Sequence, residues 1–214
     1  MTLFANREQA ARELAAQLQH HRGRHPLVLA IPRGAVPMAR IIAQALDGEF
    51  DVVLVRKLRA PYQPELAIGA IDETGWAYLA PHAARTGADT RYIEEEKRRQ
   101  LQVIRSRRAQ YTPLRAPIDP AGRVVIVVDD GLATGSTMMA ALHALRQRRP
   151  AHLVCAVPVA PPDTLEQIRP LADEVVCLQA PPGFQAVGQF YRDFEQVEDE
   201  EVMALLRQDG AQPR

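Results

Sequence analysis

The stretch VVIVVDDGLATGST, residues 124–137, decides the fold expected for this chain. Its five branched apolar residues are typical of a strand that is buried on both faces of a parallel sheet. Two adjacent aspartates, Asp129 and Asp130, end the run, and the small residues 133–137 follow. Small residues expose backbone N–H groups, and the helix start expected after them favours an anion. The stretch therefore predicts a strand end where acids hold hydroxyl groups or a hydrated metal ion, beside a turn that holds a phosphate.

Short apolar runs separated by helical patterns recur along the chain. Such alternation predicts an α/β fold, with a parallel twisted sheet flanked by helices on both faces and ligands bound at the carboxyl ends of the strands. The other expected strands are PLVLAI (26–31), DVVLVRKL (51–58), HLVCAVPVA (152–160) and EVVCLQ (174–179), and the expected helices span 7–21, 36–46, 135–148 and 163–171.

Two segments interrupt this pattern. Prolines and glycines between residues 59 and 80 separate two short extended runs, LAIGAI and WAYLA, which predicts a mobile loop with a β-hairpin. Residues 91–111 carry a narrow apolar stripe among many charges, which predicts a largely solvated helix. The expected organisation is an α/β core over 1–180 with a flexible loop at 59–80 and a helical insertion at 86–112, followed by a C-terminal hood or helical extension over 181–214.

The tail gathers aromatic residues that allow two interpretations. Phe184, Phe190, Tyr191 and Phe194 could stack on a flat heterocycle above the strand ends. Together with Val187 they also have the spacing of the core face of a helix. The spacing favours the helix.

Composition narrows the classes of function. Lys plus Arg and Asp plus Glu both number 26, so the chain lacks the basic excess typical of a protein held to nucleic acid through phosphates. A cytoplasmic location with no membrane partner is expected, because no secretory leader and no run of about 20 apolar residues is evident. The six histidines and two cysteines show no metal-ligand spacing, and the cysteines are expected to be buried and reduced.

The block VIVVDDGLATGST resembles the 13-residue signature of type I phosphoribosyltransferases, which use 5-phosphoribosyl 1-pyrophosphate (PRPP) with Mg²⁺. The resemblance implies that Asp129 and Asp130 bind the ribose 2- and 3-hydroxyls and are the candidate catalytic residues, since an oxocarbenium-like transition state is stabilised electrostatically. It implies that Ala133, Thr134, Gly135, Ser136 and Thr137 bind the 5-phosphate. Gly131 departs from the signature, which usually has an aliphatic residue or Ser there, and a small local effect is expected.

A pyrophosphate site is implied by the same resemblance. The family carries a pyrophosphate loop after its first strand, often with a strained or cis peptide, which makes the 32–35 backbone with Arg33 and Gly34 the candidate. Lys57, at the end of the second expected strand, and Arg59, just behind it on the mobile loop, are candidates for the same anion. An ordinary turn and solvated basic side chains are the alternatives. Mg²⁺ is expected to arrive with PRPP, and no protein residue is assigned as its direct ligand.

The function implied is that of a PRPP-dependent phosphoribosyltransferase, which joins a nucleobase or similar amine to ribose 5-phosphate in nucleotide metabolism or salvage. The alternative is a non-catalytic PRPP-binding regulator, and a homodimer is possible in either case. Ala133 stands where 6-oxopurine enzymes of the family have an aspartate, which argues against that acceptor class. Any general acid or base must then come from elsewhere, with Glu65, Asp72 and Glu73 as candidates.

Overall fold

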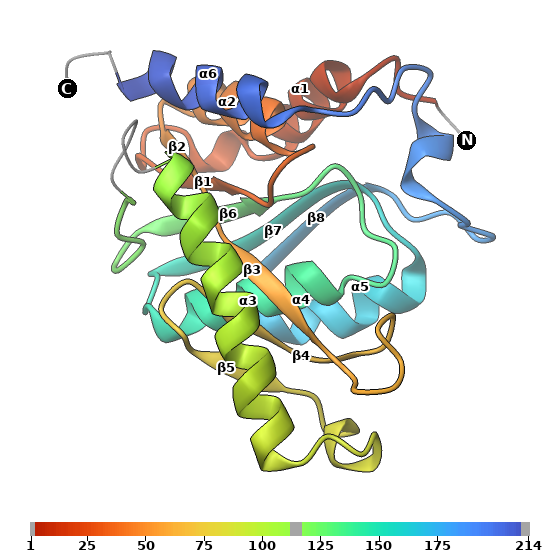
Figure 1. Ribbon diagram of the computed structural model, residues 1–214. Helices are drawn as coiled ribbons and strands as arrows, with labels where there is room; N and C mark the ends of the chain where they lie inside the picture. Colours follow the sequence, from red (N-terminus) through yellow and green to blue (C-terminus); the bar gives the residue numbers. More distant parts are fainter. Residues whose placement is uncertain (1–2, 112–116, 211–214) are drawn as a thin grey trace.

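The computed structural model describes residues 3–111 and 117–210 (Figure 1). The parts of the predicted core, helical insertion and tail at residues 1–2, 112–116 and 211–214 lie outside the described residues. A five-stranded parallel sheet forms the centre, in the order β2-β1-β6-β7-β8. The predicted fold class is confirmed. The strands are β1 (Leu27–Ala30), β2 (Glu49–Val52), β6 (Val124–Val128), β7 (His152–Val159) and β8 (Glu174–Gln179).

Helices cover both faces of this sheet (Figure 1). On one face Val28 and Ile126 pack into a core with the first two helices, and on the other Leu29 and Val127 pack against the fourth and fifth. Burial on both faces explains why the strands are continuously apolar. The covering helices are α1 (Arg7–Gln17), α2 (Val36–Ala45), α4 (Ser136–Gln147) and α5 (Pro162–Ile168), and α6 (Asp199–Gly210) packs on α2.

The order of the strands determines where a ligand crevice is expected in the sheet. β1 is hydrogen-bonded to β2 on one side and to β6 on the other. The chain therefore passes from β1 to β2 toward one edge of the sheet, and from β6 to β7 toward the opposite edge. The carboxyl ends of two such strands form the crevice in which open parallel sheets bind ligands. The 32–35 loop follows β1 and the aspartate pair follows β6, so the fold brings the two predicted sites to one place.

The prediction of one strand over 51–58 was wrong. β2 ends at Val52, and β3 (Val55–Arg59) belongs to a separate three-stranded antiparallel sheet. Arg56 and Lys57 are partly exposed there. Charged side chains of this kind do not fit a strand covered by helices on both faces, so the chain leaves the central sheet before it reaches them.

The hairpin predicted within residues 59–80 is present. β4 (Ala67–Asp72) and β5 (Ala77–Leu79) pair antiparallel, and β3 adds a third strand that the sequence did not predict. The turn is closed by Asp72, whose carboxylate accepts hydrogen bonds from Thr74 and from the amide of Trp76. The insertion helix α3 (Thr90–Tyr111) packs on β3, and few of its residues are buried, as predicted.

The prediction of a helix through the aromatic tail, residues 184–194, was wrong. Only a 3₁₀ turn, Val187–Phe190, forms there. The segment is instead fastened to the start of the chain: Phe4 N–H donates to the carbonyl of Phe190, and Arg192 N–H donates to the carbonyl of Phe4. These tertiary bonds replace helical ones, while the rings still pack together, Phe184 on Phe190 and Tyr191 on Phe194.

Both cysteines are free; Cys155 is buried and Cys177 is partly buried. Among residues 3–111 and 117–210, no helix combines the length and apolar character needed to cross a membrane.

Candidate active site

The loop after β1 lies directly against the aspartate pair. A Cβ added to Gly34 would stand 2.1 Å from Asp130 Oδ2 and 3.2 Å from a terminal nitrogen of Arg7. Only a glycine therefore allows this approach. The peptide between Pro32 and Arg33 is cis, in agreement with the expectation for this loop. The loop after β1 and the end of β6 are thus in direct contact at the carboxyl edge of the sheet.

The aspartate pair is partly buried and already engaged on one side. Asp129 Oδ1 accepts a hydrogen bond of 2.9 Å from the amide of Asp130. Burial, and after it the negative charge of Asp130, raise the pKa of Asp129 well above its ordinary value. Asp130 Oδ2 accepts from Arg7 Nε at 2.9 Å and is ion-paired with a terminal nitrogen of Arg7 at 2.8 Å.

Arg7 was not predicted from the sequence. It also donates at 2.6 Å to the carbonyl of Glu195 and stacks over Phe194 at 3.9 Å. Tyr191 completes the arrangement, since its hydroxyl donates to the Asp130 carbonyl at 2.7 Å. The C-terminal tail thus contacts the Asp130 carbonyl directly through Tyr191, and the Asp130 carboxylate indirectly through Arg7. The pairing of Arg7 with an acid 123 residues away left no local sequence signal.

The turn 133–137 has the form expected of an anion site. Gly135 has a φ of +68° and caps α4, so the turn ends at a helix amino terminus. Thr164 fixes it by donating to the Ala133 carbonyl at 2.8 Å, and the hydroxyls of Thr134 and Ser136 share a hydrogen bond of 2.7 Å. Among the hydrogen bonds of the described residues, none uses the amides of Thr134 or Gly135.

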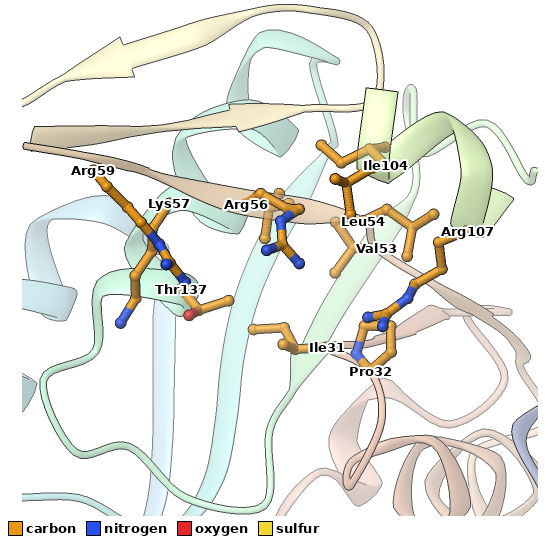
Figure 2. A pocket seen from close by; sticks show the side chains of 12 residues that line it. Ile31, Pro32, Val53, Leu54, Arg56, Lys57, Arg59, Ile104, Arg107 and Thr137 are labelled. Atoms are coloured by element: carbon orange, nitrogen blue, oxygen red, sulfur yellow. The ribbon is translucent and has the colours of Figure 1, made fainter. Parts of the chain in front are cut away.

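A pocket of about 240 Å³ lies between the 32–35 loop and Thr137 (Figure 2). Arg107 points toward Pro32, whereas Lys57 and Arg59 lie on the side of Thr137. Arg56 lies between them. Its pKa is lowered by burial and then by the positive charges of Arg107 and Arg59. Such a concentration of cations suits a dense anion.

The structure brings two of the four predicted pyrophosphate residues together in this pocket. Lys57 and Arg59 line the pocket with Pro32. The Arg33 side chain does not join them, because it is paired with Glu198 at 3.2 Å. Arg107 of α3 was missed, although the run RSRR at 105–108 was a signal that this helix could face an anion.

Two of the candidate loop acids have structural partners. Asp72 closes the hairpin turn, and Glu73 is paired with Arg108 at 2.7 Å. Glu65 lines a second, larger pocket of about 740 Å³, which also contacts Lys57 and the turn residues Thr134 and Ser136.

Packing explains why position 131, where the signature usually has an aliphatic residue or Ser, is a glycine in this chain. A Cβ there would stand 2.5 Å from Val187 Cγ1 and 3.0 Å from Val159 Cγ1. The tail therefore occupies the space that a side chain at position 131 would fill.

The family model for the phosphoribosyl transferase domain matches residues 2–195. The chain belongs to this family. A protein of Mycobacterium tuberculosis (strain CDC 1551 / Oshkosh) named "Putative phosphoribosyl transferase MT0597" is 42% identical over 207 residues, which are 96% of this chain and 47% of that protein. The chain thus spans about half the length of the curated relatives it matches first.

Solved structures agree with the phosphoribosyl transferase fold. The crystal structure of TT1426 from Thermus thermophilus is 45% identical, covers 97% of this chain and 99% of that one, and superposes with a TM-score of 0.88. A hypoxanthine phosphoribosyltransferase from Staphylococcus aureus has a TM-score of 0.50 at 15% identity, over 85% of this chain and 76% of that one. This second likeness concerns the fold alone.

Proposed function

We propose that this phosphoribosyl transferase domain binds PRPP and transfers its ribose 5-phosphate to a nitrogen base, with release of pyrophosphate. In this reaction the bond from ribose C1 to the pyrophosphate oxygen breaks, a bond from C1 to the base nitrogen forms, and the base loses a proton. The observation that carries the proposal is the convergence of three features at the carboxyl edge of β1 and β6: the Gly34 loop against Asp130, the cationic pocket, and the turn that caps α4.

Each part of PRPP has a matching feature. The turn 133–137 offers amides and hydroxyls to the 5-phosphate. Asp129 and Asp130 offer carboxylate oxygens to the ribose hydroxyls, and Lys57, Arg59 and Arg107 offer cations to the pyrophosphate. The pocket extends from Pro32 to Thr137 of the turn, so the two proposed anion sites adjoin, as a substrate with phosphates at both ends requires.

Mg²⁺ is consistent with this arrangement. It prefers oxygen ligands and commonly binds through substrate phosphates together with one or two carboxylates. Asp129 and Asp130 are the residues that would hold it or its water ligands beside PRPP, and the raised pKa of Asp129 is consistent with a carboxyl that gains from a nearby cation. When bound, the ion neutralises the charge of the departing pyrophosphate.

One observation favours the alternative of a non-catalytic PRPP-binding regulator. Asp130, which is expected to hold the ribose, is already paired with Arg7. A sugar hydroxyl would share this carboxylate with a guanidinium, which suits binding but leaves less negative charge to stabilise an oxocarbenium ion.

The test is an incubation with PRPP, Mg²⁺ and a panel of purine and pyrimidine bases, followed by mass detection of pyrophosphate and nucleotide. Product with at least one base, lost in Asp130→Asn, is the expected result. Tight PRPP binding in calorimetry without product from any base would leave the regulator as the function. Absence of PRPP binding would contradict both.

A further inference from the structure

Three histidines converge on one glutamate at the end of the sheet remote from the crevice. His20 and His21 lie in the 3₁₀ turn Gln19–His21 that follows α1. His152 is the first residue of β7 and Glu174 the first of β8. These strands begin at the amino-terminal edge of the parallel sheet, whereas the candidate active site occupies the carboxyl edge. Spacing in the sequence gave no sign of this cluster, because its members come from three separate segments.

The donor atoms stand at the separations of a metal ligand set. His21 Nε2 lies 3.0 Å from Glu174 Oε2, and His20 Nε2 lies 3.1 Å from Glu174 Oε1. One ligand atom from each of these residues can be chosen so that all lie within 4.8 Å of one another. Tetrahedral ligands about 2.0–2.1 Å from Zn²⁺ stand roughly 3.3 Å apart. His152 Nε2, at 3.5 Å from Glu174 Oε2, places a third imidazole beside the set.

The charges around the cluster favour a cation. Among the described residues, the ion-pair partners of Glu174 are imidazoles, with no lysine or arginine. Its neighbour Asp173 is paired with Arg146 at 3.0 Å. A partly buried carboxylate thus faces three imidazoles.

Burial supports the same conclusion. The His21 side chain is 1% exposed, and its Nδ1 has no hydrogen-bond partner among the described residues. Nδ1 is enclosed by the protein, so only the other nitrogen of this ring is available to a metal ion. That other nitrogen, Nε2, is the one directed at Glu174.

We propose that His20, His21 and Glu174, with His152 as a fourth donor, form a binding site for a divalent transition metal such as Zn²⁺. Imidazole and carboxylate are ligands that Zn²⁺ takes in proteins. The ion ties the end of α1 to the starts of β7 and β8. Its role is therefore to fasten the first helix to the sheet, independently of PRPP.

The test uses the full chain without a histidine tag, stripped of metal with a chelator. ZnCl₂ is titrated by calorimetry, and the melting temperature is followed with and without the ion. We expect one Zn²⁺ per chain, and a rise in melting temperature of about 5 °C at roughly a hundredfold excess over the Kd. His20→Ala and Glu174→Gln should each weaken Zn²⁺ binding at least tenfold.

The control is His25→Asn, which removes a histidine outside the cluster and keeps a residue that tolerates the φ of +46° found there. It should leave Zn²⁺ affinity unchanged, and PRPP affinity should be the same in all variants. The proposal is overturned if the parent chain binds no stoichiometric Zn²⁺, or if His20→Ala binds it as the parent does. His20 has a side chain that is 54% exposed, so this variant should fold even if Glu174→Gln does not.

Discussion

Arg7 binds Asp130 with two of its nitrogens, Nε at 2.9 Å and a terminal nitrogen at 2.8 Å, although 123 residues separate them. The same guanidinium donates to the carbonyl of Glu195 and stacks on Phe194. One side chain thus links the first helix, the C-terminal tail and the acid pair. The site is held by both ends of the chain as well as by the sheet.

Replacing Arg7 by Gln should destabilise the fold. The Arg7 and Asp130 side chains are only 14% and 17% exposed, and removing one partner leaves a poorly solvated carboxylate beside Asp129. We expect a loss of about 2 kcal/mol, which corresponds to a fall in melting temperature of roughly 4–8 °C. Thermal unfolding measures it.

The matched control is Arg12→Gln on the same helix. Arg12 is paired with Glu8, but both side chains are more than half exposed. Such a pair contributes at most about 1 kcal/mol. Equal melting temperatures for the two variants would show that the Arg7 pair does not support the fold.

Asp129→Asn should stabilise the fold while weakening PRPP binding. The pKa of Asp129 is raised, mainly by burial, so the folded state favours the neutral carboxyl and is destabilised when that carboxyl ionises. Asn keeps the oxygen that accepts from the Asp130 amide. We expect a gain of about 1 kcal/mol near pH 7.

The pH dependence of stability tests this prediction. A carboxyl group whose pKa is higher in the folded than in the unfolded state lowers the free energy of unfolding as the pH rises above about 4. The stability difference between Asp129→Asn and the parent should therefore be small at pH 4 and grow toward pH 7, as measured by urea unfolding. A stability difference that does not change with pH would mean that ionisation of Asp129 does not destabilise the folded state. PRPP affinity, measured by calorimetry with Mg²⁺, should fall at least tenfold.

The central sheet could be predicted because continuous apolar runs and intervening helical patterns are local signals. Val124–Val128 is buried at every position, as its composition indicated. The crevice followed from chain order, since the aspartates and the 32–35 loop each end a strand. The Asp129 and Asp130 pair and the turn after it were therefore accessible to sequence reasoning.

What could not be predicted depends on contacts between distant segments. The departure of β3 from the central sheet is set by its pairing with β4, and Arg107 reaches the pocket only because α3 packs on β3. The tail has helical spacing, yet it pairs with Phe4 instead, because tertiary hydrogen bonds outweigh a weak local preference. Arg7 and the histidine cluster were hidden for the same reason.

Lys57→Ala and Arg107→Ala should separate the two anion sites. Both residues line the cationic pocket, but Arg107 lies beside Pro32, whereas Lys57 also lines the second pocket together with Thr134 and Ser136 of the turn. A charge-assisted hydrogen bond is worth about 1.5–3 kcal/mol, so each variant should weaken pyrophosphate and PRPP roughly tenfold or more. Ribose 5-phosphate affinity should change little in Arg107→Ala, whereas Lys57→Ala should also weaken it, because Lys57 lies beside the turn. Calorimetry with the three ligands measures this.

The control for Arg107 is Arg105→Ala, two residues earlier on α3, where the side chain is exposed and does not line this pocket. It should leave all three affinities within about twofold, since a single solvated charge acts weakly. If Arg107→Ala weakens ribose 5-phosphate as much as pyrophosphate, the assignment of the pocket to pyrophosphate is wrong.

Gly34→Ala should damage the site more than the fold. The added methyl group would lie 2.1 Å from Asp130 Oδ2, so either the loop or the carboxylate must move. Displacing either one separates the 32–35 loop from the aspartate pair, and we expect PRPP affinity to fall by roughly a hundredfold, since small displacements of binding groups have large effects. Gly23→Ala adds the same methyl group in open space at a φ of +77°, so it should lower the melting temperature slightly and leave PRPP affinity unchanged. If Gly34→Ala binds PRPP as tightly as Gly23→Ala does, the close approach of the loop to Asp130 plays no part in substrate binding.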